Sequence, residues 1–265
     1  MTTPASGTTV TDDGARPGRH LRVWQFLVLV VAYVVVIQVS TRLITGGAET
    51  SDSPSSVPVL LREYLVPIGL AAVLVAGVTT ALRAWPDVMV ESRRLARWTL
   101  VIPVVLVLVA LGITNYPALA AEGVAFVLVL LVVVLLIGFG EELLFRGLGV
   151  RTLRASGRGE VAVGLWVSVT FGAVHLTNAL STGQVGDAVV QSVLATATGF
   201  LLYLTLRATG TLVVPMLVHA VFDLGAMSTT VDPDNPSGVT TIAAGVVLVL
   251  VLVVLLLRRR LTARA

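Results

Sequence analysis

The sequence contains no cysteine and no lysine, and it carries few charges of either sign. Without cysteine there can be no disulfide, no thiolate nucleophile and no cysteine-ligated metal. Charged residues make up 12% of the 265-residue chain and hydrophobic residues 56%, whereas about 25% of residues are charged in soluble domains. The net charge of +3 comes from arginine alone, which indicates loops that face anionic lipid and no nucleic-acid partner. We infer a polytopic membrane protein in contact with a lipid bilayer.

Long apolar runs predict an all-α fold, a bundle of about eight transmembrane helices. The predicted spans cover residues 23–44, 64–82, 98–114, 123–149, 161–180, 188–206, 211–227 and 239–257. We expect a single integral-membrane domain at 21–260, with a catalytic core at about 123–228. Residues 1–20 are rich in Thr, Ser, Gly and Asp and predict a disordered cytoplasmic tail. Residues 261–265 form a short C-terminal tail.

The placement of arginine predicts the orientation of the chain. Arg83, Arg93, Arg94 and Arg97 follow the second span, and Arg151, Arg154 and Arg158 follow the fourth. The loops on the opposite side carry mainly Asp and Glu. Because cytoplasmic loops are enriched in basic residues, both termini are predicted to be cytoplasmic. We expect a multi-pass protein of the cell inner (plasma) membrane.

Three ionisable residues occur together at the end of the fourth apolar run. Each costs at least ~2.5–3.5 kcal/mol inside hydrocarbon, so such residues usually mark a functional site. Glu142 and Arg146 are four residues apart, share a helix face and are predicted to form a structural ion pair. Glu141 points about 100° away from Glu142 and is left free for chemistry. The alternative is an ion-pair clamp between helices without catalysis.

Two later spans add polar side chains at a similar depth. The fifth carries His175, and the seventh carries His219 and Asp223, which share one helix face. At ~1.5 Å per residue these three and Glu141 lie roughly 12–21 Å from the cytoplasmic ends of their spans. Boundary errors of a few residues make these depths compatible with one layer. We therefore predict that four polar side chains from three helices converge.

This set of side chains suits the activation of water. Glu141 could take a proton from water while His175 orients it, and His219 could stabilise an oxyanion. The sequence does not choose between this direct activation, which uses no cofactor, and activation by a metal. A zinc ion or another divalent metal held by Glu141, His175, His219 and Asp223 is the alternative. Serine chemistry fits poorly, because no serine in these spans belongs to a Ser-His-Asp pattern.

Three ordered motifs add a resemblance to a known family. They are Glu-Glu-Leu-Leu-Phe-Arg-Gly from Glu141, Ser-Val-Thr-Phe-Gly-Ala-Val-His-Leu around His175, and Gly-Thr-Leu-Val-Val-Pro-Met-Leu-Val-His-Ala-Val-Phe-Asp-Leu around His219. Residues 124–224 resemble the CPBP family, the CAAX-protease and bacteriocin-processing (Abi) intramembrane endopeptidases, and are similar to the prenyl-protein (CAAX) proteases.

The resemblance implies a role for each matching residue. Glu141 corresponds to the catalytic base and His175 to the water-orienting residue, and Glu142 and Arg146 correspond to the structural pair. His219 and Asp223 correspond to the oxyanion stabilisers. Asp223 departs from the pattern, because the members nearest the eukaryotic prenyl-protein proteases carry asparagine there. An ionised aspartate would repel an oxyanion, so its role is left open between a hydrogen bond, the orientation of His219 and a metal.

The predicted function is therefore an intramembrane endopeptidase that acts on a membrane-associated protein or peptide. It is a metalloendopeptidase if the metal alternative holds. One alternative is a catalytically inactive membrane scaffold or immunity protein that uses the same cavity. A proton-coupled transporter is less consistent with the sequence, because the outer halves of the fourth, fifth and seventh spans are almost wholly apolar.

Overall fold

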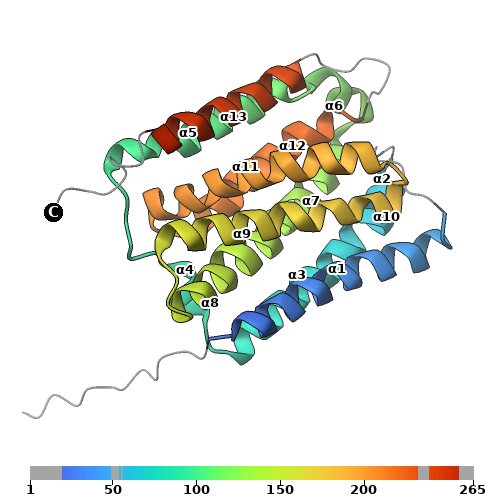
Figure 1. The fold of residues 1–265 in the computed structure, drawn as a ribbon. Coiled ribbons are helices and arrows are strands. Elements are labelled where there is room, and N and C mark those ends of the chain that lie inside the picture. The colour runs from blue at the N-terminus through green and yellow to red at the C-terminus, as the bar shows by residue number, and fades with distance from the viewer. Residues whose placement is uncertain (1–19, 49–53, 55, 232–238, 257–265) are drawn as a thin grey trace, which may run out of the picture.

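The computed structural model describes residues 20–48, 54, 56–231 and 239–256, and within these ranges the chain is helical (Figure 1). The described residues contain no named strand and only an isolated antiparallel bridge between Val90 and Thr211. The predicted all-α class is thus confirmed. The predicted tails, apart from residue 20, lie outside the described residues. The cytoplasmic position of the termini stays a prediction.

The helices lie roughly side by side in one bundle (Figure 1). In chain order the elements are α1 (Val23–Thr45), α2 (Val57–Val59), η1 (Leu60–Leu65), α3 (Val66–Ala81), α4 (Trp85–Met89), η2 (Arg97–Leu100), α5 (Val101–Ile113), α6 (Tyr116–Glu122), α7 (Val124–Glu142), η3 (Leu143–Gly149), α8 (Val150–Ala155), α9 (Glu160–His175), η4 (Leu176–Asn178), α10 (Ala179–Thr182), α11 (Val185–Thr209), α12 (Val213–Ser228) and α13 (Val239–Leu256). α5 and α13 lie on one side, α1 and α3 on the other (Figure 1). α12 contacts both α5 and α7, and α9 contacts α11, so the helices with the predicted site residues form the centre.

Five helical segments of the described chain are long and apolar enough to cross a membrane, and a bent pair makes a sixth. The bent pair joins η2 and α5 to α6 with a 61° break. The fold is thus that of a multi-pass membrane protein, with fewer qualifying spans than the eight predicted. α12 has 16 residues, or about 24 Å at 1.5 Å per residue, which is short of the ~30 Å hydrocarbon core.

Several predicted boundaries were wrong for identifiable reasons. The second span begins at Val57 rather than at residue 64, because Pro58 is tolerated in a first helical turn and does not delay the helix. The third span stops at Ile113, and the Asn115 side chain accepts a hydrogen bond from the Ala118 amide to start α6. The fourth continues without interruption to Ala155 through η3, a π-helical segment.

Two glycines allow the central helices to approach closely. A Cβ on Gly138 of α7 would collide with the Met216 carbonyl oxygen of α12. A Cβ on Gly172 of α9 would collide with the Thr196 side chain of α11. Small residues at such crossings bring helix backbones together in membranes. The first crossing brings together the helices that carry Glu141 and His219, and the second packs the helix of His175 on α11, which also contacts α12.

Candidate active site

The Glu142–Arg146 pair lies at the centre of the bundle. Arg146 Nη1 lies 2.7 Å from Glu142 Oε1, and neither side chain has exposed surface. Arg146 Nη2 also donates to the Gly199 carbonyl of α11 at 2.8 Å, and the guanidinium carbon lies 4.3 Å from the centroid of the Phe171 ring. The pair therefore contacts both α9 and α11. The i, i+4 pairing predicted from the sequence is present, although the helix changes to π geometry directly after Glu142.

His219 lies among three carboxylates. Its Nδ1 is 2.9 Å from Glu142 Oε1, and because that carboxylate is paired with Arg146, we assign the proton to Nδ1. Its Nε2 is 3.4 Å from Asp223 Oδ2 and 3.8 Å from Glu141 Oε2. If Nε2 of His219, the Asp223 carboxyl and the Glu141 carboxyl were all deprotonated, only hydrogen-bond acceptors would face one another. At least one of these three groups must therefore carry a proton. The cluster can therefore hold a proton beside Glu141.

Glu141 differs from its neighbour in lining a cavity, and its closest charged partner is His219 Nε2 at 3.8 Å. Its Oε2 is buried and makes no hydrogen bond within the described part of the protein. Glu141 also lines a cavity of about 70 Å³ between α1, α7 and α9, together with His175. That volume exceeds the roughly 10–15 Å³ that one water molecule needs. A carboxylate whose Oε2 makes no hydrogen bond thus borders a space that can admit a small reactant.

His175 enters the same cavity in a defined tautomer. Its Nδ1 lies 2.8 Å from the Phe171 carbonyl oxygen, which can only accept a hydrogen bond. Nδ1 therefore carries the proton, and Nε2 of the neutral ring is an acceptor. The ring also packs edge to face on Phe171, as does that of His219. His175 thus offers an acceptor to a reactant beside Glu141.

The structure brings the predicted residues together in two ways. His219 contacts Glu141, Glu142 and Asp223 directly and so links the three carboxylates. His175 joins Glu141 through the cavity that both line. No group of three or more His, Asp or Glu side chains among the described residues is arranged to hold a metal ion. As arranged, the side chains do not fit a zinc ion, so no step is assigned to one, and the metal alternative stays a prediction.

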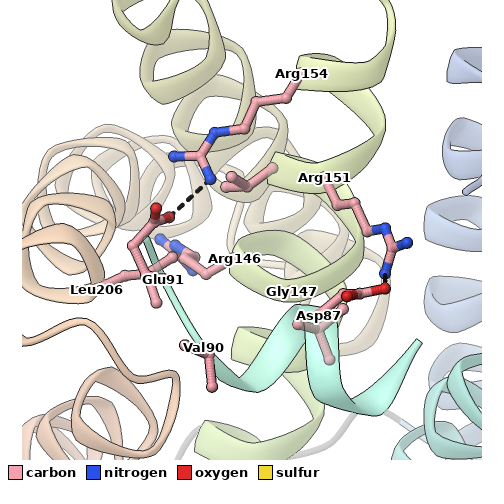
Figure 2. Close-up of a pocket in the computed structure, with 10 residues that line it drawn as sticks. Asp87, Val90, Glu91, Arg146, Gly147, Arg151, Arg154 and Leu206 are labelled. Carbon is pink, nitrogen blue, oxygen red and sulfur yellow. Dashed lines mark hydrogen bonds and ion pairs between the residues drawn. The ribbon is translucent and has the colours of Figure 1, made fainter. Parts of the chain in front are cut away.

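A larger cavity of about 280 Å³ opens at the end of the bundle near α4 and α8. Figure 2 shows Arg154 paired with Glu91 and Arg151 paired with Asp87 on its walls, at 2.7 Å and 2.6 Å. Arg146 also borders it, but Glu141 does not. The larger cavity therefore meets the site only through the Glu142–Arg146 pair. The carboxylate available for chemistry faces the smaller one.

Two polar features of the structure were not predicted from the sequence. Glu160 forms ion pairs with Arg93, Arg154 and Arg207 and accepts a hydrogen bond from the Tyr203 hydroxyl. These charges come from distant segments, and no local spacing predicts them. The second feature is Tyr33 of α1, which lines the small cavity. The sequence does contain a signal for it, namely a single tyrosine in the middle of an apolar helix. A buried tyrosine hydroxyl usually has a hydrogen-bond partner, so such a residue can indicate a polar site.

Residues 123–225 match the family model described as type II CAAX prenyl endopeptidase Rce1-like. This segment is thus similar to the CAAX-protease family. The resemblance drawn from the three motifs is thereby confirmed. No significant match was found among curated proteins or among solved structures. The family is one of membrane-embedded proteases, and its match contains every predicted site residue, whereas Tyr33 lies outside it.

Proposed function

We propose that this protein is an intramembrane endopeptidase of the inner (plasma) membrane that hydrolyses a peptide bond in a membrane-associated protein or peptide. The observation that carries the proposal is the contrast between the two adjacent glutamates. Glu142 is held through its Oε1 by Arg146 and His219, whereas Glu141 lines a cavity and its Oε2 is buried without a hydrogen bond in the part of the chain that the structure describes. A carboxylate in that setting suits a general base.

The first step of this mechanism is the attack of water on the scissile carbonyl carbon. Glu141 accepts one proton of the water while the His175 Nε2 accepts a hydrogen bond from the other. The new O–C bond forms as the carbonyl π electrons move to the carbonyl oxygen, which becomes an oxyanion. The aligned acceptors reduce the cost of orienting water, since positioning contributes strongly to catalysis.

The second step is the collapse of the tetrahedral intermediate. The oxyanion reforms the carbonyl and the C–N bond breaks, while Glu141 returns its proton to the leaving nitrogen. The products are a new carboxyl terminus and a new amine, and the base is regenerated. His219 Nε2 and Asp223 Oδ2 are 3.4 Å apart. We propose that these two side chains hold a proton that balances the negative charge beside Glu141.

The test compares peptide termini in membranes that contain the wild type or Glu141→Ala. Termini present only with the wild type identify the bond that is cleaved. For a fluorogenic peptide that spans this bond, we expect Glu141→Ala and Glu141→Gln to lower kcat by about 10²–10⁴-fold. Glu122→Gln is the matched control, because Glu122 is an exposed carboxylate at the end of α6.

The outcomes separate the predicted functions. Identical termini with wild type and Glu141→Ala, in protein that is folded and inserted, would favour the catalytically inactive scaffold. Full turnover by Glu141→Gln would show cleavage without Glu141 as the base. Loss of turnover in Glu122→Gln to the same extent would indicate a general effect of removing carboxylates.

A further inference from the structure

The Tyr33 hydroxyl is buried beside the reacting groups without a partner. The side chain is 2% exposed, and its hydroxyl makes no hydrogen bond to any described residue. A Cβ placed on Gly140, the residue before Glu141, would lie 3.5 Å from the hydroxyl oxygen. A buried polar group without a partner is costly, so its position calls for a functional reason.

The other polar side chains around the small cavity already make hydrogen bonds. Gln38 donates to the Thr177 carbonyl at 3.2 Å, and the Thr177 hydroxyl donates to the Val174 carbonyl at 2.6 Å. Asn178 donates to the Gln191 side chain at 2.8 Å. These bonds tie α1 and α11 to the segment that follows α9. Among the polar groups that line the cavity, the Tyr33 hydroxyl is thus the donor that is not engaged.

The two groups assigned to the water molecule are both acceptors. Glu141 accepts a proton, and His175 presents Nε2 as an acceptor because Nδ1 is bound to the Phe171 carbonyl. Neither can stabilise negative charge on the attacked carbonyl oxygen. His219 is not among the residues that line this cavity, and its Nδ1 is bound to Glu142. His219 can donate only from Nε2, which faces Asp223 and Glu141, so a donor on the cavity wall itself would add to it.

We propose that Tyr33 is a catalytic residue whose phenolic hydroxyl donates a hydrogen bond to the oxyanion of the tetrahedral intermediate. The inference rests on the proposed peptidase function and adds a residue from the first helix, outside the segment that matches the family. The proton stays on the phenol oxygen throughout, so the balance of the two hydrolytic steps is unchanged. Preorganised donors of this kind act most strongly where water is excluded.

The test is Tyr33→Phe, which keeps the ring and removes only the hydroxyl. With the fluorogenic peptide that spans the bond mapped by the Glu141→Ala comparison, we expect kcat to fall by about 10²–10³-fold, as for loss of one oxyanion donor. KM should change little, because the bond is made in the transition state. The thermal midpoint should stay equal to or above that of the wild type, since an unpaired buried hydroxyl is removed.

A second probe tests the same contact without turnover. A phosphinate analogue of the mapped peptide replaces the scissile amide by a tetrahedral anionic group, and we expect Tyr33→Phe to weaken its binding far more than that of the uncleaved peptide. Tyr116→Phe is the matched control, because the Tyr116 ring is exposed and its hydroxyl donates to the Leu111 carbonyl. That variant should match the wild type in kcat and in both affinities.

The outcomes distinguish this inference from the proposed function. If the wild type cleaves, Glu141→Ala does not, and Tyr33→Phe keeps full kcat, the role of Tyr33 is refuted and the peptidase stands. A fall in kcat accompanied by an equal loss of affinity for phosphinate and peptide would also refute it, because that pattern reflects a general structural role. If wild type and Glu141→Ala give identical termini, the peptidase proposal fails and the role of Tyr33 fails with it.

Discussion

Replacing Arg146 by methionine should destabilise the protein more than most single substitutions do. The change removes the ion pair with Glu142, the hydrogen bond to the Gly199 carbonyl and the contact with the Phe171 ring. Glu142 keeps only its bond to His219, so its charge stays buried without a permanent counter-charge. Removing one partner of a buried pair costs about 3–5 kcal/mol, and we expect a loss of unfolding free energy in that range.

The companion variant is the double substitution Glu142→Gln with Arg146→Met. Its glutamine carries no charge, and the amide oxygen can still accept the hydrogen bond from His219 Nδ1. We expect a coupling of about 2–3 kcal/mol between the two changes, at the upper end for residues in contact. The double variant should thus regain much of the stability lost in Arg146→Met. Wild type, both single variants and the double variant form the complete cycle.

The assay is reversible unfolding in mixed micelles with an increasing fraction of denaturing detergent, followed by helical circular dichroism. Inactive protein can be measured in this way, so the result does not depend on the catalytic proposal. The interpretation of the pair as a structural element would be refuted if Arg146→Met unfolded at the same detergent fraction as the wild type. It would also be refuted if the double variant were no more stable than Arg146→Met.

Two further predictions concern the surroundings of the pair and of His219. A Cβ on Gly199 would lie 2.8 Å from Arg146 Nη2 and 2.9 Å from the Phe171 ring, so Gly199→Ala should cost about 1–3 kcal/mol in the same assay. Gly69→Ala is its control, because a Cβ there meets nothing within 4 Å; equal stability of the two variants would contradict the packing argument. Asp223→Asn keeps a hydrogen-bonding group 3.4 Å from His219 Nε2 in the wild-type geometry, so we expect it to keep much of the peptidase activity. Metal analysis of the purified wild type and variant is the decisive measurement, and stoichiometric zinc that is lost together with activity in the variant would favour the metal alternative.

The sequence predicted the parts of the site that depend on local spacing. Glu142 and Arg146 pair as their four-residue separation implies, and His219 and Asp223 lie on one face of α12. The convergence of Glu141 with these residues was also predictable, because charged groups in apolar spans must face the interior of a bundle. The catalytic roles of these residues stay predictions.

Other features depend on contacts between distant segments and leave no local pattern. The bridge between Val90 and Thr211 and the ion pairs of Glu160 join parts of the chain that only the tertiary fold brings together. The π-helical segment after Glu142 was not predicted, because the apolar run gives the same signal for α- and π-helical hydrogen bonding. Tyr33 was overlooked because its helix was treated as a membrane span without chemistry.

The position of Glu142 and Arg146 on one helix also bears on how the protein enters the membrane. In two-stage folding, helices insert first and associate afterwards. The carbonyl of Gly199 and the ring of His219 belong to helices that follow later in the chain, whereas Arg146 and Glu142 need no other helix to meet. We expect the segment Val124–Ala155 to leave the translocon with its counter-ion already in place, while the ribosome is still making α11 and α12.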